Sequence, residues 1–73
     1  MKICDLDLNE TQKKVLSLTI TPRTAYEIAA KLKKSYSSIN QNLGILIALK
    51  YVRKIDKMKN GVVYQLDTKQ VQP

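Results

Sequence analysis

The stretch that decides the fold is residues 33–52, KKSYSSINQNLGILIALKYV. On a helix with about 100° between residues, Ile39, Leu43 and Leu46 fall on one face, which is typical of burial. The opposite face, which we name the uncharged strip, consists of Ser37, Asn40, Gln41, Gly44 and Ala48. A solvated helix face normally carries Lys and Glu, and lysines are frequent on both sides of this stretch. The strip therefore predicts a recognition helix that lies in a DNA major groove.

Two helices with capping signals are predicted before this stretch. A capping box joins an N-cap residue to a Glu or Gln three residues later, and the two candidate pairs are Asn9 with Gln12 and Thr24 with Glu27. The β-branched run before Pro22 ends the first helix, and Ser35 caps the third. The inward faces are expected to carry Val15, Leu16 and Leu18, and then Ala25, Ile28, Ala29 and Leu32. Only about three residues separate the second helix from the third, which is the spacing of a helix-turn-helix.

After residue 51 the apolar spacing changes and predicts a β-hairpin. Asn60-Gly61 between two alternating runs is a strong signal for a type I′ turn. This turn pairs Lys59 with Val62, Lys57 with Tyr64, and Ile55 with Leu66. In that register Ile55, Val62, Tyr64 and Leu66 share one apolar face. The flanking residues 1–8 and 68–73 are predicted to form an N-terminal arm and a disordered polar tail.

Length and charge limit the possible functions. Seventy-three residues make one small domain, for which extra stabilisation such as dimerisation is expected. The net charge of +7 and the pI near 9.7 indicate a polyanionic partner. The charge is −2 over residues 1–10, +5 over residues 11–37 and +4 over residues 38–73. The acidic N-terminal segment is therefore expected to face away from that partner.

The residue inventory argues against an enzyme and against a metal site. The chain has no His, and Cys4 is its only cysteine, so an internal disulfide, a thiol–imidazole nucleophile and a soft metal-ligand set are all excluded. The carboxylates are scattered, and no cofactor is expected. The N-terminus lacks the apolar run of a signal peptide, and residues 43–49 are too few to span a bilayer. A lone cysteine fits a reducing compartment, so a cytoplasmic location is expected.

The order of three helices and a basic hairpin resembles the winged helix-turn-helix family of DNA-binding proteins. The resemblance is carried by residues 24–32, 35–52 and 62–66, and it covers about residues 8–66. It is closest in style to small prokaryotic transcription regulators, and the composition, rich in Lys, Ile and Tyr, resembles that of compact regulators of archaea or their viruses and plasmids. It implies a mainly α fold with a small β-hairpin (α+β), with the winged-helix domain over residues 9–67. Lys50 stands where the family usually has glycine, and a less sharp end of the third helix is expected there.

The predicted DNA site follows from the recognition helix and its surroundings. Base-reading roles are predicted for Ser35, Tyr36, Ser37, Asn40 and Gln41. Contacts with the DNA backbone are predicted for Arg23, Thr24, Lys33, Lys34, Ser38, Gly44, Lys57, Lys59 and Asn60. Asn and Gln pair with adenine, and the helix has no Arg to read guanine, so an A·T-leaning operator is predicted. A glycine costs a helix about 1 kcal/mol, so Gly44 indicates either close approach to DNA or packing against another helix.

Further surfaces leave alternatives open. Ile45 and Ile47 widen the apolar arc of the third helix, and the excess is covered either by the N-terminal arm or by a second subunit. A homodimer that acts as a repressor is expected, with no small-molecule effector evident. Tyr36 is expected to be partly buried and Tyr64 to belong to the core. The main competing function is a winged-helix protein-interaction module, and RNA binding is disfavoured because exposed aromatic platforms are not expected.

Overall fold

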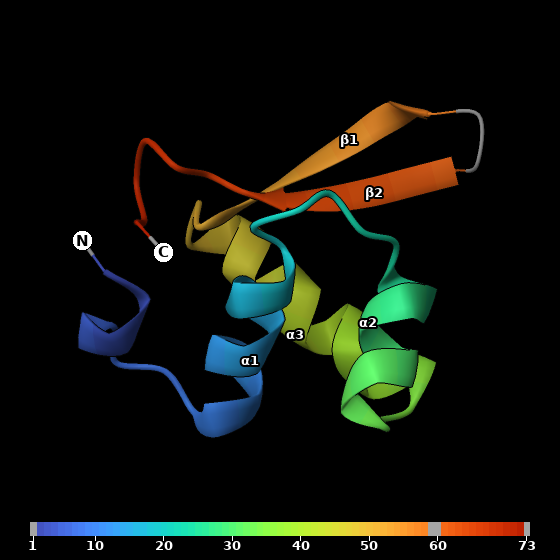
Figure 1. Cartoon of the computed structure of the whole chain (residues 1–73), viewed down its shortest axis with the longest axis horizontal. Helices are drawn as coiled ribbons and strands as arrows, with labels where there is room; N and C mark the ends of the chain where they lie inside the picture. The colour runs from blue at the N-terminus through green and yellow to red at the C-terminus, as the bar shows by residue number, and fades with distance from the viewer. Residues whose placement is uncertain (1, 59–60, 73) are drawn as a thin grey trace.

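The computed structural model describes residues 2–58 and 61–72. A short 3-10 helix, Ile3–Asp5, precedes three α-helices and a two-stranded antiparallel hairpin. The elements are α1 (Glu10–Leu18), α2 (Ala25–Leu32), α3 (Tyr36–Ala48), β1 (Val52–Met58) and β2 (Gly61–Leu66). The hairpin lies across one end of the helices, and residues 2 and 72 lie side by side, across α1 from α2 (Figure 1). Within the described residues, no helix combines the length and the apolar character that crossing a bilayer requires.

All three helices begin at the predicted N-caps. The Asn9 side chain accepts from the Gln12 N–H at 2.8 Å, and the Gln12 side chain accepts from the Asn9 N–H at 3.2 Å, which confirms the first capping box. Thr24 accepts from the Glu27 N–H, but the Glu27 carboxylate does not complete a box. It pairs instead with the Arg23 guanidinium at 3.4 Å. The predicted capping box at α2 is therefore half formed, because an arginine one residue before the cap competes for the carboxylate.

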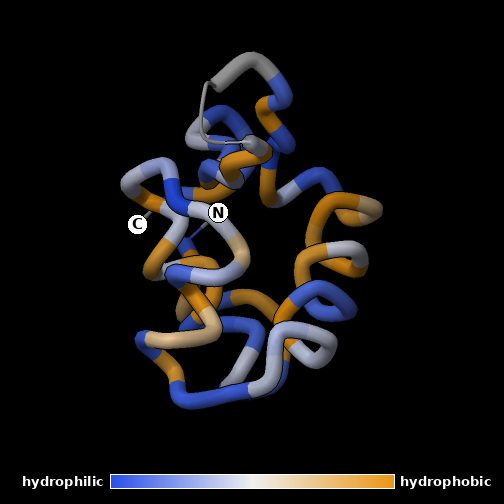
Figure 2. Tube along the Cα trace, turned by 90° about the vertical axis from the view of Figure 1, so that its right-hand side faces the viewer, coloured by the Kyte–Doolittle hydropathy of each residue, from blue (hydrophilic) through white to orange (hydrophobic). Residues whose placement is uncertain are grey.

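The core lies between the three helices and the inner face of the hairpin. The predicted inward residues of α3, namely Ile39, Leu43 and Leu46, are fully buried, and so are Val15, Leu16 and Ile28 on the other helices. Tyr64 is buried with them, which confirms its predicted place in the core. Hydrophobic and hydrophilic residues alternate along the helices in Figure 2, as one-sided burial requires. The core thus fixes α3 so that its opposite face points outward.

Two helices end at lysines in the left-handed backbone region. Lys33 has φ 55° and Lys50 has φ 65°. The Lys50 and Tyr51 N–H groups donate to the carbonyls of Ile47 and Leu46 at 2.9 and 3.0 Å, which is the Schellman arrangement of a tightly closed helix end. The expectation of a less sharp end at Lys50 is therefore wrong. The lysine adopts the conformation that glycine favours, at a conformational cost that glycine would not carry.

The hairpin forms, but in a different register from the predicted one. Ile55 pairs with Val63 rather than with Leu66, and Val52 takes the place opposite Leu66. The register shifts between Ile55 and Met58, and Gly61 pairs with Met58 as the first residue of β2. The predicted turn and pairs at Lys59 and Asn60 lie outside the described residues. The physical reason for the different register is that Val52 and Ile55 are three residues apart, so a strand places them on opposite faces.

Strand β2 is also fastened to the segment between α1 and α2. The Leu66 N–H donates to the Thr19 carbonyl at 2.7 Å, and Arg23 and Tyr64 exchange two backbone hydrogen bonds of 3.1 and 2.7 Å. The Thr19 side chain is itself buried and donates to the Leu16 carbonyl at 2.8 Å. These bonds hold the β1–β2 hairpin, which we call the wing, at a fixed place relative to the helix-turn-helix of α2 and α3.

The two ends of the chain join the same core. Ile3, Leu6 and Val71 are buried together, and the Ile3 N–H donates to the Gln72 carbonyl at 3.1 Å. The expectation of a disordered tail over residues 68–73 is therefore wrong for the described residues 68–72. A turn at Asp67 redirects the chain, because the Val71 N–H donates to the Asp67 carbonyl at 2.9 Å. The single aliphatic residue of the tail is thereby placed against the N-terminal segment.

Candidate nucleic-acid interface

The uncharged strip of α3 is exposed along its whole length. Ser37, Asn40, Gln41, Gly44 and Ala48 are all exposed, while the buried face of the same helix holds the core. The amide groups of Asn40 and Gln41 have no hydrogen-bond partner among the described residues. Together with Tyr36 and Ser37 they line an open hollow of about 380 Å³. The predicted base-reading side chains are therefore available to an outside partner, with Ser35 as the exception described next.

Ser35 and Ser38 have structural roles at the start of α3. The Ser35 hydroxyl accepts from the Ser38 N–H at 3.2 Å, which satisfies one of the free amides of the first turn. The Ser38 carbonyl accepts in turn from the Asn42 amide at 2.9 Å, and Ser38 is half-buried. Ser35 thus shapes the helix that carries the strip, and its remaining O–H donor is all that a partner can use.

Gly44 sits on an open part of the strip. A Cβ built at this residue meets nothing within 4 Å beyond the neighbouring backbone of its own helix. Packing against another helix of the same chain, one of the two explanations for this glycine, is therefore excluded among the described residues. Close approach by an outside partner is the explanation that the geometry leaves, with either DNA or a second copy as that partner.

Cations gather at the turn between α2 and α3. Lys33 and Lys34 are both exposed there, directly before the N-terminus of α3. Arg23 is less available than predicted, because its Nε donates to the Leu18 carbonyl at 2.9 Å and its Nη1 pairs with Glu27. Thr24 is occupied as the cap of α2. The side chain of Lys57, and all of Lys59 and Asn60, lie outside the described residues.

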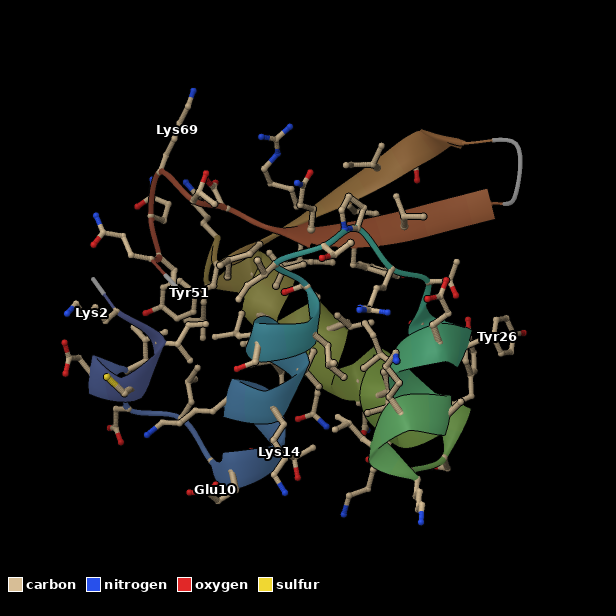
Figure 3. All side chains as sticks on the ribbon, in the orientation of Figure 1. Lys2, Glu10, Lys14, Tyr26, Tyr51 and Lys69 are labelled. Atoms are coloured by element: carbon tan, nitrogen blue, oxygen red, sulfur yellow. The ribbon has the colours of Figure 1, made fainter. Side chains whose placement is uncertain are left out.

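The acidic N-terminal segment lies far from this turn. Lys2 and Glu10 stand on the side of α1, across the molecule from Tyr26 on α2 (Figure 3). Lys14 stands on the same side as Glu10, so cations and carboxylates are mixed there (Figure 3). The turn before α3 carries Lys33 and Lys34, and α3 itself carries no charged side chain.

Two tyrosines form an exposed stack beside the strip. The rings of Tyr26 and Tyr36 have centroids 4.3 Å apart and planes inclined by 18°. Tyr26 is 69% exposed and Tyr36 is 42% exposed, and neither belongs to the core. The expected partial burial of Tyr36 in the core is therefore wrong, because its ring packs on another exposed ring instead. The expectation that exposed aromatic platforms are lacking is wrong for the same reason.

Sequence reasoning did not place Tyr26 in the site. The available signal was the position of the two tyrosines in the first turns of the two helices of the helix-turn-helix. Tyr26 is the second residue of α2, and Tyr36 is the first residue of α3. A second hollow, of about 210 Å³, separates this pair from the wing and is lined by Thr24, Ala25, Tyr26, Tyr36, Gly61, Val62 and Tyr64. The tyrosine pair thus forms a ridge between the strip and the wing.

Among the described residues, no three His, Cys, Asp or Glu side chains come together in a way that could hold a metal ion. Cys4 is exposed and is a free thiol. Burial raises the pKa of the Tyr64 hydroxyl, and the nearby Asp56 carboxylate raises it further. This tyrosine is therefore neutral at physiological pH and presents a hydroxyl, not a charge.

This chain is similar to known proteins in structure, not in sequence family. No model of a known protein family matches the sequence, and no characterised protein matches it by sequence. Two solved structures of Lactococcus lactis ZitR, a mutant and the wild type in complex with DNA, are 26% identical to this chain. Their TM-scores are 0.82 and 0.81, and each match covers 89% of this chain and 47% of ZitR. The chain has a winged helix-turn-helix fold.

A third similar structure is that of the Helicobacter pylori ferric uptake regulator Fur, which has three functional metal-binding sites. Its TM-score is 0.73 and its sequence is 19% identical, over 84% of this chain and 46% of Fur. At that identity the match supports the fold alone. The chain spans just under half the length of each of these neighbours.

Proposed function

We propose that this chain binds double-stranded DNA as a transcription regulator, with α3 in the major groove and the wing on the adjacent backbone. The observation that carries the proposal is the exposed uncharged strip of α3, which begins directly after the lysine turn at Lys33 and Lys34. An α-helix fits the major groove and presents its N-terminal half to base edges. The similarity to ZitR, solved in complex with DNA, supports DNA as the partner.

Within this mode, Asn40 and Gln41 are the main readers of sequence. A side-chain amide can donate to N7 of adenine through its NH₂ group and accept from the N6 amino group through its oxygen. The side chains of Asn40 and Gln41 are both exposed. Residues 36–48 contain no Arg, which is the usual reader of guanine. The proposed operator is therefore rich in A·T pairs at the positions that α3 covers.

Phosphate contacts supply most of the affinity in this proposal. Lys33 and Lys34 lie at the turn, and the free N–H groups at the start of α2 and α3 add donors that favour an anion. Lys57, Lys59 and Asn60 remain proposed contacts of the wing. Six phosphate contacts would give a slope of about −5 for log K against log salt concentration.

We also propose that the regulator acts as a homodimer and as a repressor. Ile45 lies on α3, and Leu49 caps the helix one turn later. The two are 47% and 46% exposed, so the N-terminal segment does not cover them. A second copy is the occupant that this proposal assigns to them. A twofold dimer would read two half-sites about 34 Å apart. Sedimentation of the free chain and of its DNA complex tests the proposed dimer. A monomer in both states would refute it.

The test of DNA binding begins with duplexes selected by the wild-type chain from a random pool. Asn40→Ala/Gln41→Ala should lower the preference for selected over random duplex, and Lys33→Ala/Lys34→Ala should weaken binding to both and flatten the salt slope. Lys14→Ala/Lys69→Ala removes the same charge from exposed positions away from α3 and serves as the control. Equal losses for both lysine pairs would show that net charge alone drives binding and would overturn the proposed site.

One observation favours a second candidate function. The exposed Tyr26–Tyr36 stack is the kind of aromatic surface that protein-docking sites use, and the winged-helix fold also serves as a docking domain. The same titration separates the two functions. A folded wild-type chain that selects no duplex from the pool would favour docking over DNA binding.

A further inference from the structure

The Tyr26–Tyr36 stack joins the two helices of the helix-turn-helix outside the core. Tyr26 comes from the first turn of α2, and Tyr36 is the first residue of α3. A ring distance of 4.3 Å with nearly parallel planes is a well-formed aromatic stack. Neither tyrosine belongs to the core, so their stack is the contact to which we assign the orientation of the two rings.

Tyr36 is the ring that borders the uncharged strip. It lines the same hollow as Ser37, Asn40 and Gln41, and it also lines the hollow on the side of the wing. Tyr26 lines only the second hollow. One face of Tyr36 is therefore held by Tyr26, while the rest of its ring is presented beside the amides.

An A·T pair offers matching chemistry to this arrangement. Adenine presents N7 and N6 to an amide, and its thymine partner presents the only methyl group found in the major groove. An aromatic ring beside the amides of Asn40 and Gln41 can contact that methyl group with its apolar body. Serine hydroxyls and amides alone would leave the methyl group unread.

We propose that Tyr36 reads a thymine methyl group and that Tyr26 is a positioning residue, which holds the Tyr36 ring in place before DNA arrives. This inference rests on the proposed DNA-binding function and adds to it a specificity determinant from α2. A free tyrosine at the start of a helix would lose side-chain freedom on binding, which lowers an association constant by roughly 2- to 12-fold. The stack removes that loss in advance, because Tyr36 is already ordered by Tyr26 in the free protein.

The test replaces thymine with uracil, one position at a time, in a duplex selected by the wild-type chain. Uracil pairs with adenine in the same way and lacks only the C5 methyl group. At one or more positions the wild type should bind the uracil duplex about fourfold more weakly, as expected for one buried methyl group. Tyr36→Ala should bind the thymine and uracil duplexes equally well.

Variants of Tyr26 separate positioning from a merely structural role. Tyr26→Ala should lower affinity by roughly 2- to 12-fold and reduce the thymine-to-uracil ratio, although Tyr36 is still present. Tyr26→Phe keeps the ring stack and should restore both the affinity and the ratio. Thermal melts of the free variants should stay close to that of the wild type, because Tyr26 is mostly exposed.

The outcomes distinguish this inference from the function on which it rests. A wild type that binds the selected duplex but is indifferent to every uracil substitution would overturn the methyl-reading role and leave DNA binding intact. A Tyr26→Ala variant with an unchanged thymine-to-uracil ratio would overturn the positioning role. A wild type that binds no duplex would refute the proposed function itself.

Discussion

Replacing Gly44 with alanine should move folding stability and DNA affinity in opposite directions. Gly44 lies inside α3, and an added Cβ meets nothing within 4 Å beyond the neighbouring backbone of its own helix. The full difference in helix propensity is therefore available, and the free energy of unfolding should rise by about 1 kcal/mol. For a domain of this size that gain raises the melting temperature by about 4–8 °C.

Binding should respond differently if DNA approaches the helix at this residue. A methyl group forced into a close contact typically costs about 1–3 kcal/mol, so affinity for a selected duplex should fall by about 5- to 150-fold. Thermal melts followed by circular dichroism measure the first effect, and fluorescence anisotropy of a labelled duplex measures the second. Ala48→Gly offers the reverse change near the end of the same strip.

Either measurement can refute the reasoning. A Gly44→Ala variant with an unchanged or lower melting temperature would show that this face is covered in solution, contrary to the open geometry. A more stable variant with unchanged DNA affinity would remove Gly44 from the interface and leave its presence unexplained by DNA. The stabilisation must be measured well below and well above the concentration at which copies associate, because a dimer contact would also respond.

Three further predictions concern the helix ends, the tail and the wing. Lys50→Gly and Lys33→Gly should each stabilise the free chain by about 0.5–1 kcal/mol in thermal melts. Glycine removes the cost of the left-handed backbone, and its larger loss of entropy on folding offsets part of that gain. Only Lys33→Gly should also weaken DNA binding. Val71→Ala should destabilise the chain by about 1.5–2.5 kcal/mol in urea unfolding, while the exposed neighbour Gln70→Ala should change stability by no more than about 0.5 kcal/mol. Folding raises the pKa of Tyr64 above the unfolded value of 10.0, so the neutral hydroxyl stabilises the fold. This contribution to the free energy of unfolding is full below pH 10.0 and is lost as the pH rises through the folded pKa. Melts above pH 10.0 should therefore fall more steeply for the wild type than for Tyr64→Phe, and parallel curves would contradict this.

Local signals predicted the helices and the face that each one buries. Capping chemistry at Asn9, Thr24 and Ser35 acts over three residues, so sequence alone identifies it, and all three caps are found. The buried residues Ile39 and Leu43 follow from the helical period in the same way. The uncharged strip is the face of α3 opposite these buried residues. The same helical period therefore predicted both the core and the candidate site.

Features that depend on distant partners were predicted less well. In the strand register, Val52 lies opposite Leu66, and the pairing is irregular between Ile55 and Met58. The alternation of apolar and polar residues along the sequence indicates neither feature. Val71 is a single aliphatic residue in a polar segment, so no periodicity marks its burial against Ile3.

The tyrosine stack belongs to the same class of feature. Tyr26 and Tyr36 are ten positions apart in the sequence, and their contact depends on the angle between two helices. That angle is a property of the folded core, which no local pattern specifies. The role of Tyr26 could therefore be proposed only after the helices had been placed.

The meeting of the two chain ends has a practical consequence for engineering. The Ile3 N–H donates to the Gln72 carbonyl, and residues 2 and 72 form a parallel bridge, so a linker of about a dozen residues could join them without distorting the folded domain. Such a ring would restrict the unfolded chain far more than the native one, so heat resistance should increase through the reference state alone. The closure lies across the molecule from α2, which makes the ring a scaffold whose added linker stands away from the Tyr26 side of the fold (Figures 1 and 3).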